Sequence, residues 1–235
     1  MKALLVVAVL ILANGRLVSA QHIREQDKAY STSIVREINL NHPSNQFLFG
    51  KKALLSQLLI EHTENSCCKI YNPYNKEVEI SRKEFTSNLS YPNDSCGFER
   101  YLSSQVYLIE LQEEFVFDKN RSEFKFIPEY ITLYIPPEVN YTGIMQPIAS
   151  WKYEDCEKIF RSDSRAFSEA PRSFGKSKVH FCETFLLRAY TSEIVKIGAD
   201  ALYFDQLHPD TTQAALMGKE EEYRIQEMVY KAFHP

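Results

Sequence analysis

Aromatic residues alternate with other residues on both sides of a short charged break, in the stretch EFVFDKNRSEFKF from Glu114 to Phe126. Every second residue of a strand lies on the same face of a sheet. If Asn120 and Arg121 form the centre of a tight turn, Phe117 lies opposite Phe124 and Phe115 opposite Phe126. The same register then pairs Leu111 with Tyr130, Ile109 with Thr132 and Tyr107 with Tyr134. The pattern predicts a long antiparallel hairpin from Val106 to Ile135.

The other face of this hairpin changes character along its length. It is charged near the turn and apolar near the base, so we expect the base to be buried on both faces and the tip on one. Pro128 cannot donate a ladder hydrogen bond, which predicts a bulge or an edge position in the second strand. We interpret the aromatic row chiefly as packing against a helix of the same domain, with a docking surface or a ligand platform as alternatives.

Apolar residues at helical spacing predict two helices outside the hairpin. The first covers 51–64, where Leu54, Leu55, Leu58, Leu59 and His62 form one stripe. The second follows Trp151, with Tyr153, Cys156, Ile159 and Phe160 on its apolar side. Both stripes should face a core.

The C-terminal third contains two more helical patterns. In VHFCETFLLRAYTSEIVKI, helical intervals separate Phe181, Phe185, Leu186, Ala189 and Ile194, which predicts a late helix. Asp210 can cap a final helix that ends near Phe233. That helix has an apolar stripe, and packing on its own domain is the main interpretation, with partner binding as the alternative. The stripe consists of Ile225, Met228, Val229, Ala232 and Phe233.

Two segments rich in turn-forming and polar residues predict loops, at 88–97 and 163–178. The combination of one long hairpin and several helices predicts an α+β fold. We expect a single domain over 21–205, in which helices pack on the hairpin, followed by a C-terminal helical extension over 206–235.

The first twenty residues have the features of a signal peptide. Lys2 is followed by an apolar run from Ala3 to Ala13, and Val18-Ser19-Ala20 supplies the small residues of a cleavage site. Eleven residues are too few to cross a bilayer core of about 30 Å. We therefore expect an exported mature chain that begins at Gln21.

The charge and glycine content argue against several function classes. Loss of Lys2 and Arg16 leaves 25 basic against 31 acidic residues, so the formal charge moves from -4 to -6 and nucleic acid is not an expected partner. Six of the seven glycines remain, and none builds a phosphate-binding loop. We expect no cofactor and no catalytic site. Cys182 with His180 is the nearest approach to a nucleophile and base, but two residues apart on a helix they point in different directions.

Five cysteines remain in a compartment that permits disulfides: Cys67, Cys68, Cys96, Cys156 and Cys182. The odd number leaves at least one thiol unpaired or shared with a partner, and the pairing stays open. Their spacing does not match a zinc site, so we expect no bound metal.

Four blocks together give the chain a family resemblance: VREINLNHPSNQFLF, YLIELQEEFVFDKNRSEFKF, QPIASWKYEDCEKIF and FCETFLLRAYTSEIVKIGADALYF. In this order they resemble the GldN/PorN family of periplasmic ring components of the type IX secretion and gliding motility machinery, of which the chain looks like a divergent member. The most specific pieces are Phe117-Asp118-Lys119 with Arg121-Ser122, and Arg188, Ser192, Ile194 and Lys196 in the predicted late helix.

The resemblance implies a non-catalytic subunit at the inner face of the outer membrane. It implies self-association in a ring, an outer-membrane lipoprotein partner of the PorK/GldK kind, and contact with inner-membrane-anchored motor or periplasmic shaft components. The candidate structural or interface residues are Phe115, Phe117, Asp118, Arg121, Phe124, Phe126, Arg188 and Lys196. Two alternatives are an exported ligand- or protein-binding module and a thiol-dependent enzyme.

Overall fold

The computed structural model describes residues 23–49, 53–65, 68–93, 97–169 and 178–233. The predicted signal peptide lies outside these residues. Helices and strands are mixed along the chain, and the fold is α+β as predicted. The elements are η2 (Glu25–Asp27), β1 (Lys28–Asn39), α2 (Pro43–Phe49), α3 (Leu55–Glu64), α4 (Arg82–Asn88), β2 (Ser90–Asn93), β3 (Gly97–Arg100), η3 (Ser103–Gln105), β4 (Leu108–Asp118), β5 (Glu123–Ile135), β6 (Gln146–Lys152), α5 (Tyr153–Ser162), β7 (Phe167–Glu169), β8 (Lys178–His180), α6 (Phe181–Leu186), β9 (Glu193–Ile197), α7 (Phe204–Leu207) and α8 (Thr211–Phe233).

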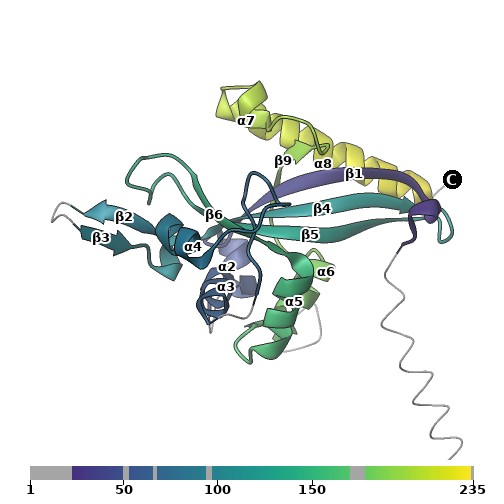
Figure 1. Ribbon diagram of the computed structural model, residues 1–235. Helices are drawn as coiled ribbons and strands as arrows, with labels where there is room; N and C mark the ends of the chain where they lie inside the picture. The colour runs from purple at the N-terminus through teal and green to yellow at the C-terminus, as the bar shows by residue number, and fades with distance from the viewer. Residues whose placement is uncertain (1–22, 50–52, 66–67, 94–96, 170–177, 234–235) are drawn as a thin grey trace, which may run out of the picture.

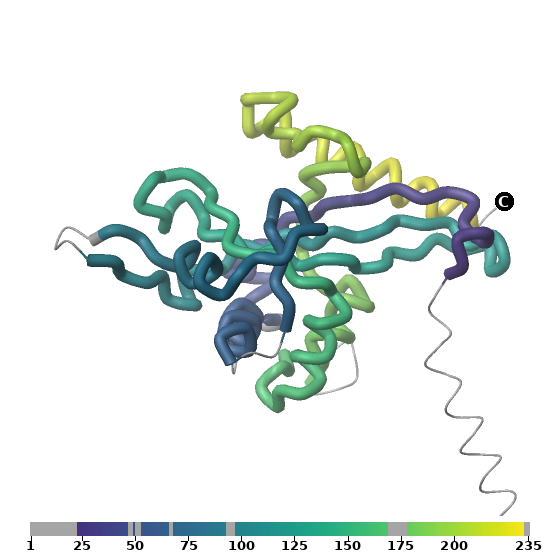
Figure 2. The backbone as a smooth tube through the Cα atoms, viewed as in Figure 1, coloured from purple at the N-terminus to yellow at the C-terminus, as the bar shows by residue number. Residues whose placement is uncertain are grey.

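A five-stranded sheet in the order β6-β5-β4-β1-β9 organises the molecule. All its neighbouring strands are antiparallel. Figure 1 shows β1, β4 and β5 as long strands side by side, with α7 and α8 above them in the view and α2, α3, α5 and α6 below. The tube in Figure 2 shows that the β2–β3 hairpin and the hairpin tip of β4 and β5 project at opposite ends of the view.

The predicted long hairpin is β4 and β5, and its register is correct near the tip only. Phe117 pairs with Phe124 and Phe115 with Phe126, as the alternation predicts. The register shifts between Gln112 and Glu113, where Glu113 pairs with Pro128 and Gln112 with Tyr130. This is the bulge that Pro128 predicts, and it shifts the pairs between the bulge and the base of the hairpin by one residue from the predicted register. Leu111 therefore pairs with Ile131, Ile109 with Leu133 and Leu108 with Tyr134.

The predicted late helix is wrong beyond its first turns. It ends at Leu186, and Arg188 adopts a positive φ of 50°. The residues that follow include β-branched Ile194 and Val195, which suit a pleated strand, and they pair with β1 as β9. Arg188 thus lies in the connection after α6, and Lys196 lies on the edge strand.

Three of the other predicted elements need smaller corrections. Leu54 has extended backbone angles and precedes α3, so this helix starts at Leu55 rather than at Lys51, and residues 50–52 lie outside the described part. Both predicted loops contain short strands, because turn-forming residues also connect two-stranded hairpins. These pairs are β2 with β3 and β7 with β8; residues 94–96 and 170–177 are not described.

The helix after Trp151 and the final helix form where the sequence predicts them. In α5, Cys156, Ile159 and Phe160 are buried. The backbone N–H of Thr212 donates to Asp210 Oδ1 at 2.8 Å, which is the predicted cap of α8. Of the predicted stripe on α8, Ile225 is buried and Met228 and Val229 are half-buried, whereas the side chain of Phe233 lies outside the described part.

Candidate functional site

One face of the long hairpin carries two separate hydrophobic clusters. Ile109 and Leu111 belong to a large cluster that contains the apolar sides of α3, α5 and α6. Phe115 lies on the same face of β4 and belongs to a smaller cluster with Ile34, Ile194, Phe204 and Ile225. Glu113 lies between them on β4, so a charged residue interrupts the apolar face at the boundary.

Four charged residues form a belt at this boundary: Arg36, Glu113, Arg188 and Glu222. Arg36 Nε donates to Glu113 Oε2 at 3.1 Å, and Arg188 Nη1 donates to Glu113 Oε1 at 2.5 Å. Arg36 Nη1 donates to Glu222 Oε2 at 2.5 Å, which ties α8 to β1. The side chains of Arg36 and Glu113 are only 2% and 1% exposed. A buried charge is strongly destabilising without its partner, so Arg36 and Glu113 depend on each other at the centre of this charged belt.

Aromatic rings complete the belt. The Arg188 guanidinium lies 3.7 Å from the centroid of the Phe126 ring, and the Arg36 guanidinium lies 5.7 Å from the same centroid. Such contacts between a cation and a ring face are favourable, especially when water is excluded. Tyr190 Oη also donates to Glu113 Oε1, at 3.5 Å. The predicted site residues Phe126 and Arg188 are therefore neighbours, although they come from separate parts of the chain.

The aromatic row packs against a helix of its own chain, and this helix lies in the predicted C-terminal extension rather than in the predicted domain. The rings of Phe115 and Phe124 stack with centroids 4.8 Å apart, and those of Phe115 and Phe126 lie 4.7 Å apart. Phe124 and Phe126 pack with Met228 and Val229 of α8 in the smaller cluster. The covering helix is thus the C-terminal one.

The hairpin tip holds the remaining predicted residues of this strand pair. Asp118 Oδ1 accepts hydrogen bonds from the backbone N–H groups of Asn120 at 3.0 Å and Arg121 at 3.3 Å, which shapes the turn. Asp118 is buried, whereas Arg121 is exposed. Phe117 packs on Phe124 at 4.8 Å. Of the predicted residues, Arg121 is the one best placed to meet another protein.

The family comparison covers almost the whole described chain. The family described as gliding motility associated protein GldN matches residues 23–233. The chain belongs to the GldN family. No curated protein sequence matches it. As a GldN-family protein it is a component of the gliding motility and type IX secretion machinery and works with protein partners within that machinery.

The GldN family is a structural family of the secretion machinery rather than an enzyme family. Among the described residues, no helix is both long enough and apolar enough to cross a bilayer. In the same part of the chain, no three His, Cys, Asp or Glu side chains are grouped to hold a metal ion.

Two buried thiols of this GldN-family chain, those of Cys156 and Cys182, do not have the environment of a nucleophile. Cys156 and Cys182 are free thiols, and Cys67 and Cys96 lie outside the described residues. Burial raises the pKa of Cys182 to about 11 and raises that of Cys156 well above its usual value. A reactive cysteine needs the opposite shift. His180 Nδ1 accepts a hydrogen bond from the backbone N–H of Cys182 at 3.3 Å and so caps α6.

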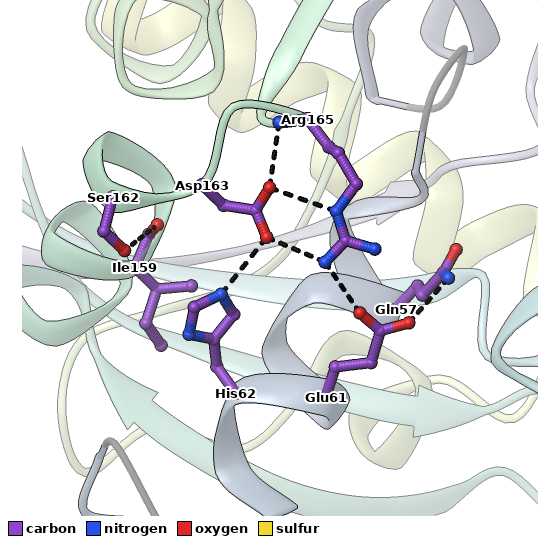
Figure 3. A network of polar contacts seen from close by, with 7 residues as sticks. All are labelled: Gln57, Glu61, His62, Ile159, Ser162, Asp163 and Arg165. Atoms are coloured by element: carbon purple, nitrogen blue, oxygen red, sulfur yellow. Dashed lines mark hydrogen bonds and ion pairs between the residues drawn. The ribbon is translucent and has the colours of Figure 1, made fainter. Parts of the chain in front are cut away.

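A second polar network joins α3 to the end of α5 (Figure 3). The carboxylate of Asp163 lies at its centre and accepts hydrogen bonds from Arg165 Nη2 at 2.7 Å and Arg165 Nε at 3.1 Å. His62 Nε2 lies 3.2 Å from Asp163 Oδ2, and Arg165 Nη2 also donates to Glu61 Oε2 at 2.7 Å. Hydrogen bonding from Arg165 holds the pKa of Asp163 below its usual range. The network fixes two helices of the large cluster together.

The sequence analysis did not identify the ion pairs of the charged belt. It also did not identify a row of three glutamates, Glu110 on β4, Glu37 on β1 and Glu193 on β9. In the sequence, Arg36 is 77 residues from Glu113 and 186 residues from Glu222, so local spacing gives no signal that these residues form ion pairs. One signal was available: Arg36 follows Ile34 and precedes Ile38 on a strand, so alternation places a charge on an apolar face.

Proposed function

We propose that the chain is a non-catalytic structural subunit of a periplasmic ring in the type IX secretion and gliding machinery. Repeated identical contacts between copies would build the ring, and a PorK/GldK-like lipoprotein would attach it to the inner face of the outer membrane. The family match over residues 23–233 carries the proposal. Inner-membrane-anchored motor or periplasmic shaft components would meet the same assembly.

The geometry supports a rigid role for the hairpin. Its base is buried on both faces, and its tip is held by α8, by the stacked phenylalanines and by the charged belt. Exposed Arg121 at the tip and the exposed side of α8 are then available to neighbouring subunits. Arg188 and Lys196 contact Phe126 and Tyr203 within the chain, so in this proposal they hold the subunit's shape.

The test is recovery of the tagged protein from its native envelope in mild detergent, followed by the mass and composition of the complex. A very large assembly that contains an outer-membrane lipoprotein supports the ring subunit. Arg121→Glu should reduce the recovered partner, whereas Lys83→Glu, at an exposed position of α4, is a matched charge reversal that should not. A lone chain of mature size contradicts the proposal.

An exported ligand-binding module is the second candidate, because one cavity of about 230 Å³ lies between the β9 edge and the α7–α8 segment. Typical small-molecule sites have about 300–1,000 Å³, so this cavity is small for the role. A monomer that copurifies with a small molecule, and with no lipoprotein, would favour this function.

A further inference from the structure

Three glutamates lie in one row across three neighbouring strands of the sheet. Glu37 on β1 pairs in register with Glu110 on β4 on one side and with Glu193 on β9 on the other. Glu110 is buried, Glu37 is half-buried and Glu193 is exposed, so the row runs from the solvent into the sheet. Like charges directly opposite one another on neighbouring strands repel.

The segment after β9 covers this row. Tyr203 Oη donates to Glu110 Oε2 at 3.2 Å, and Tyr134 Oη donates to the same oxygen at 2.9 Å. Phe204 is buried in the smaller hydrophobic cluster. The cavity of about 230 Å³ is lined by the three glutamates and by Tyr203, Phe204 and the first turns of α8. Residues 198–233 thus form an arm that closes over the carboxylates, and Figure 1 shows this arm extending from β9 through α7 into α8.

The charges around Glu37 are mostly of its own sign. Glu110, Glu193, Asp205 and Glu138 all act on it from four different parts of the fold, and burial together with these carboxylates raises the pKa of Glu37 to about 7. Burial also raises the pKa of Glu110, which hydrogen bonds from Tyr134 and Tyr203 and the charges of Lys76 and Lys196 partly oppose. From α8, the residues that line the cavity are Thr211, Ala214 and Ala215, which have no charge.

We propose that the arm of residues 198–233 is a proton-dependent clamp on the β9 edge of the sheet. It closes over the carboxylate row when Glu37 carries a proton, and it loosens when Glu37 is ionised beside Glu110 and Glu193. The hydrogen bond from Tyr203 to Glu110 anchors the closed form, because Tyr203 belongs to the arm. A group that holds its proton more tightly in the closed form favours closure at low pH. The closed arm is therefore most protected in mildly acidic solution and loses protection as the pH rises through about 7.

Hydrogen exchange of the full chain, read by mass spectrometry at pH 5.5 and pH 8, tests the clamp. After correction for intrinsic exchange rates, peptides from 198–216 should exchange on the order of tenfold faster at pH 8, because a difference of one pKa unit between closed and open forms corresponds to a tenfold change. Peptides from β4 and β5 should keep their protection.

Glu37→Gln removes the titrating group while keeping its shape, so the arm should stay protected at both pH values. Glu129→Gln changes a glutamate that does not line the cavity and should leave the pH dependence intact. The fold of each variant is checked by emission from Trp151, which is fully buried. If Glu37→Gln does not fold, exposed Glu193→Gln replaces it and should move the transition to lower pH.

Two results would overturn the clamp: equal corrected exchange of the arm at both pH values, or an unchanged pH dependence in the folded Glu37→Gln or Glu193→Gln variant. The proposal concerns the isolated chain and does not depend on ring assembly.

Discussion

At the scale of single residues, Glu113 is a buried carboxylate whose stability depends on its two arginine partners. It is 1% exposed and accepts hydrogen bonds from two arginines that reach it from β1 and from the connection after α6. Arg36 Nη2 makes no hydrogen bond within the described part of the chain, so the belt already has one unsatisfied donor. Removal of the central carboxylate would leave both guanidinium groups without their common partner.

Glu113→Gln should therefore lower the free energy of unfolding by about 3–5 kcal/mol, the usual result of breaking a buried ion pair. The neighbouring Glu114→Gln is the matched control. Glu114 is 19% exposed and pairs with Lys28, so its loss should be about 1 kcal/mol or less. Urea unfolding of the two variants measures the difference. Equal losses would show that the belt does not depend on the charge of Glu113.

At the scale of elements, the contact between α8 and β9 depends on a glycine. A Cβ atom on Gly218 would lie well inside van der Waals distance of the backbone carbonyl oxygen of Ile194. At Gly218, α8 therefore lies directly against the backbone of the edge strand, and Gly218 is buried although it lies in the middle of a helix.

Gly218→Ala combines two effects of opposite sign on the stability of the protein. Helix propensity alone would raise stability by about 1 kcal/mol, whereas the clash with β9 should lower it by about 1–3 kcal/mol. We expect the clash to dominate, because the atom that would have to move is backbone rather than a flexible side chain. Thermal unfolding measures the sign, and Glu220→Ala on the exposed side of α8 should change stability by less than about 0.5 kcal/mol. A more stable Gly218→Ala protein would contradict this packing.

The network between α3 and α5 predicts a stability change that depends on pH. The pKa of Asp163 is lowered in the folded chain by its hydrogen bonds from Arg165, so it contributes stability that is fully present above its usual pKa of 3.8 and is lost as the pH falls below that value. Asp163→Asn should lower the free energy of unfolding by about 1–2 kcal/mol at pH 7.

Urea unfolding at pH 7 and pH 3 tests this. The difference between the Asp163→Asn variant and the unmodified chain should be smaller at pH 3, because the Asp163 carboxyl of the unfolded chain is then mostly protonated and part of the stability that its ionised form contributes is lost. Glu157→Gln, which breaks an exposed pair with Arg161 within α5, should cost about 0.5 kcal/mol or less at pH 7. A difference that is constant with pH would rule out a role for the Asp163 charge.

The elements that the sequence predicted well are those whose signal is local. Alternation around Asn120 and Arg121 is enough for the hairpin tip, and Asp210 with a long apolar stripe is enough for α8. The wrong predictions concern segments whose secondary structure is determined by a partner far away in the sequence. Ile194 fits a helical interval from Phe181, but β1 provides a strand edge, and pairing with it outweighs local periodicity. The charged belt and the carboxylate row could not be predicted, because register between distant strands brings their members together.

At the scale of the whole molecule, the charged belt divides the interior into two parts of unequal size. The larger cluster includes Trp151, whose Nε1 donates to Thr63 Oγ1 at 3.0 Å and whose ring packs edge-on against Phe85. The smaller cluster depends on the arm, through Phe204 and Ile225. If residues 206–235 are an extension of the domain, as predicted, their loss should remove one side of the smaller cluster and leave the larger cluster intact.

A chain truncated after His208 should therefore keep its larger core and lose its smaller one. Trp151 is the single tryptophan, so its emission should stay at the wavelength of a buried indole. Phe124 and Phe126 would lose Met228 and Val229 as neighbours, and binding of a hydrophobic dye should increase. Arg36 would lose Glu222, so unfolding should occur at lower urea concentration. A shift of the Trp151 emission to that of an exposed indole would mean that the two clusters form one cooperative core and that α8 belongs to the domain rather than extending it.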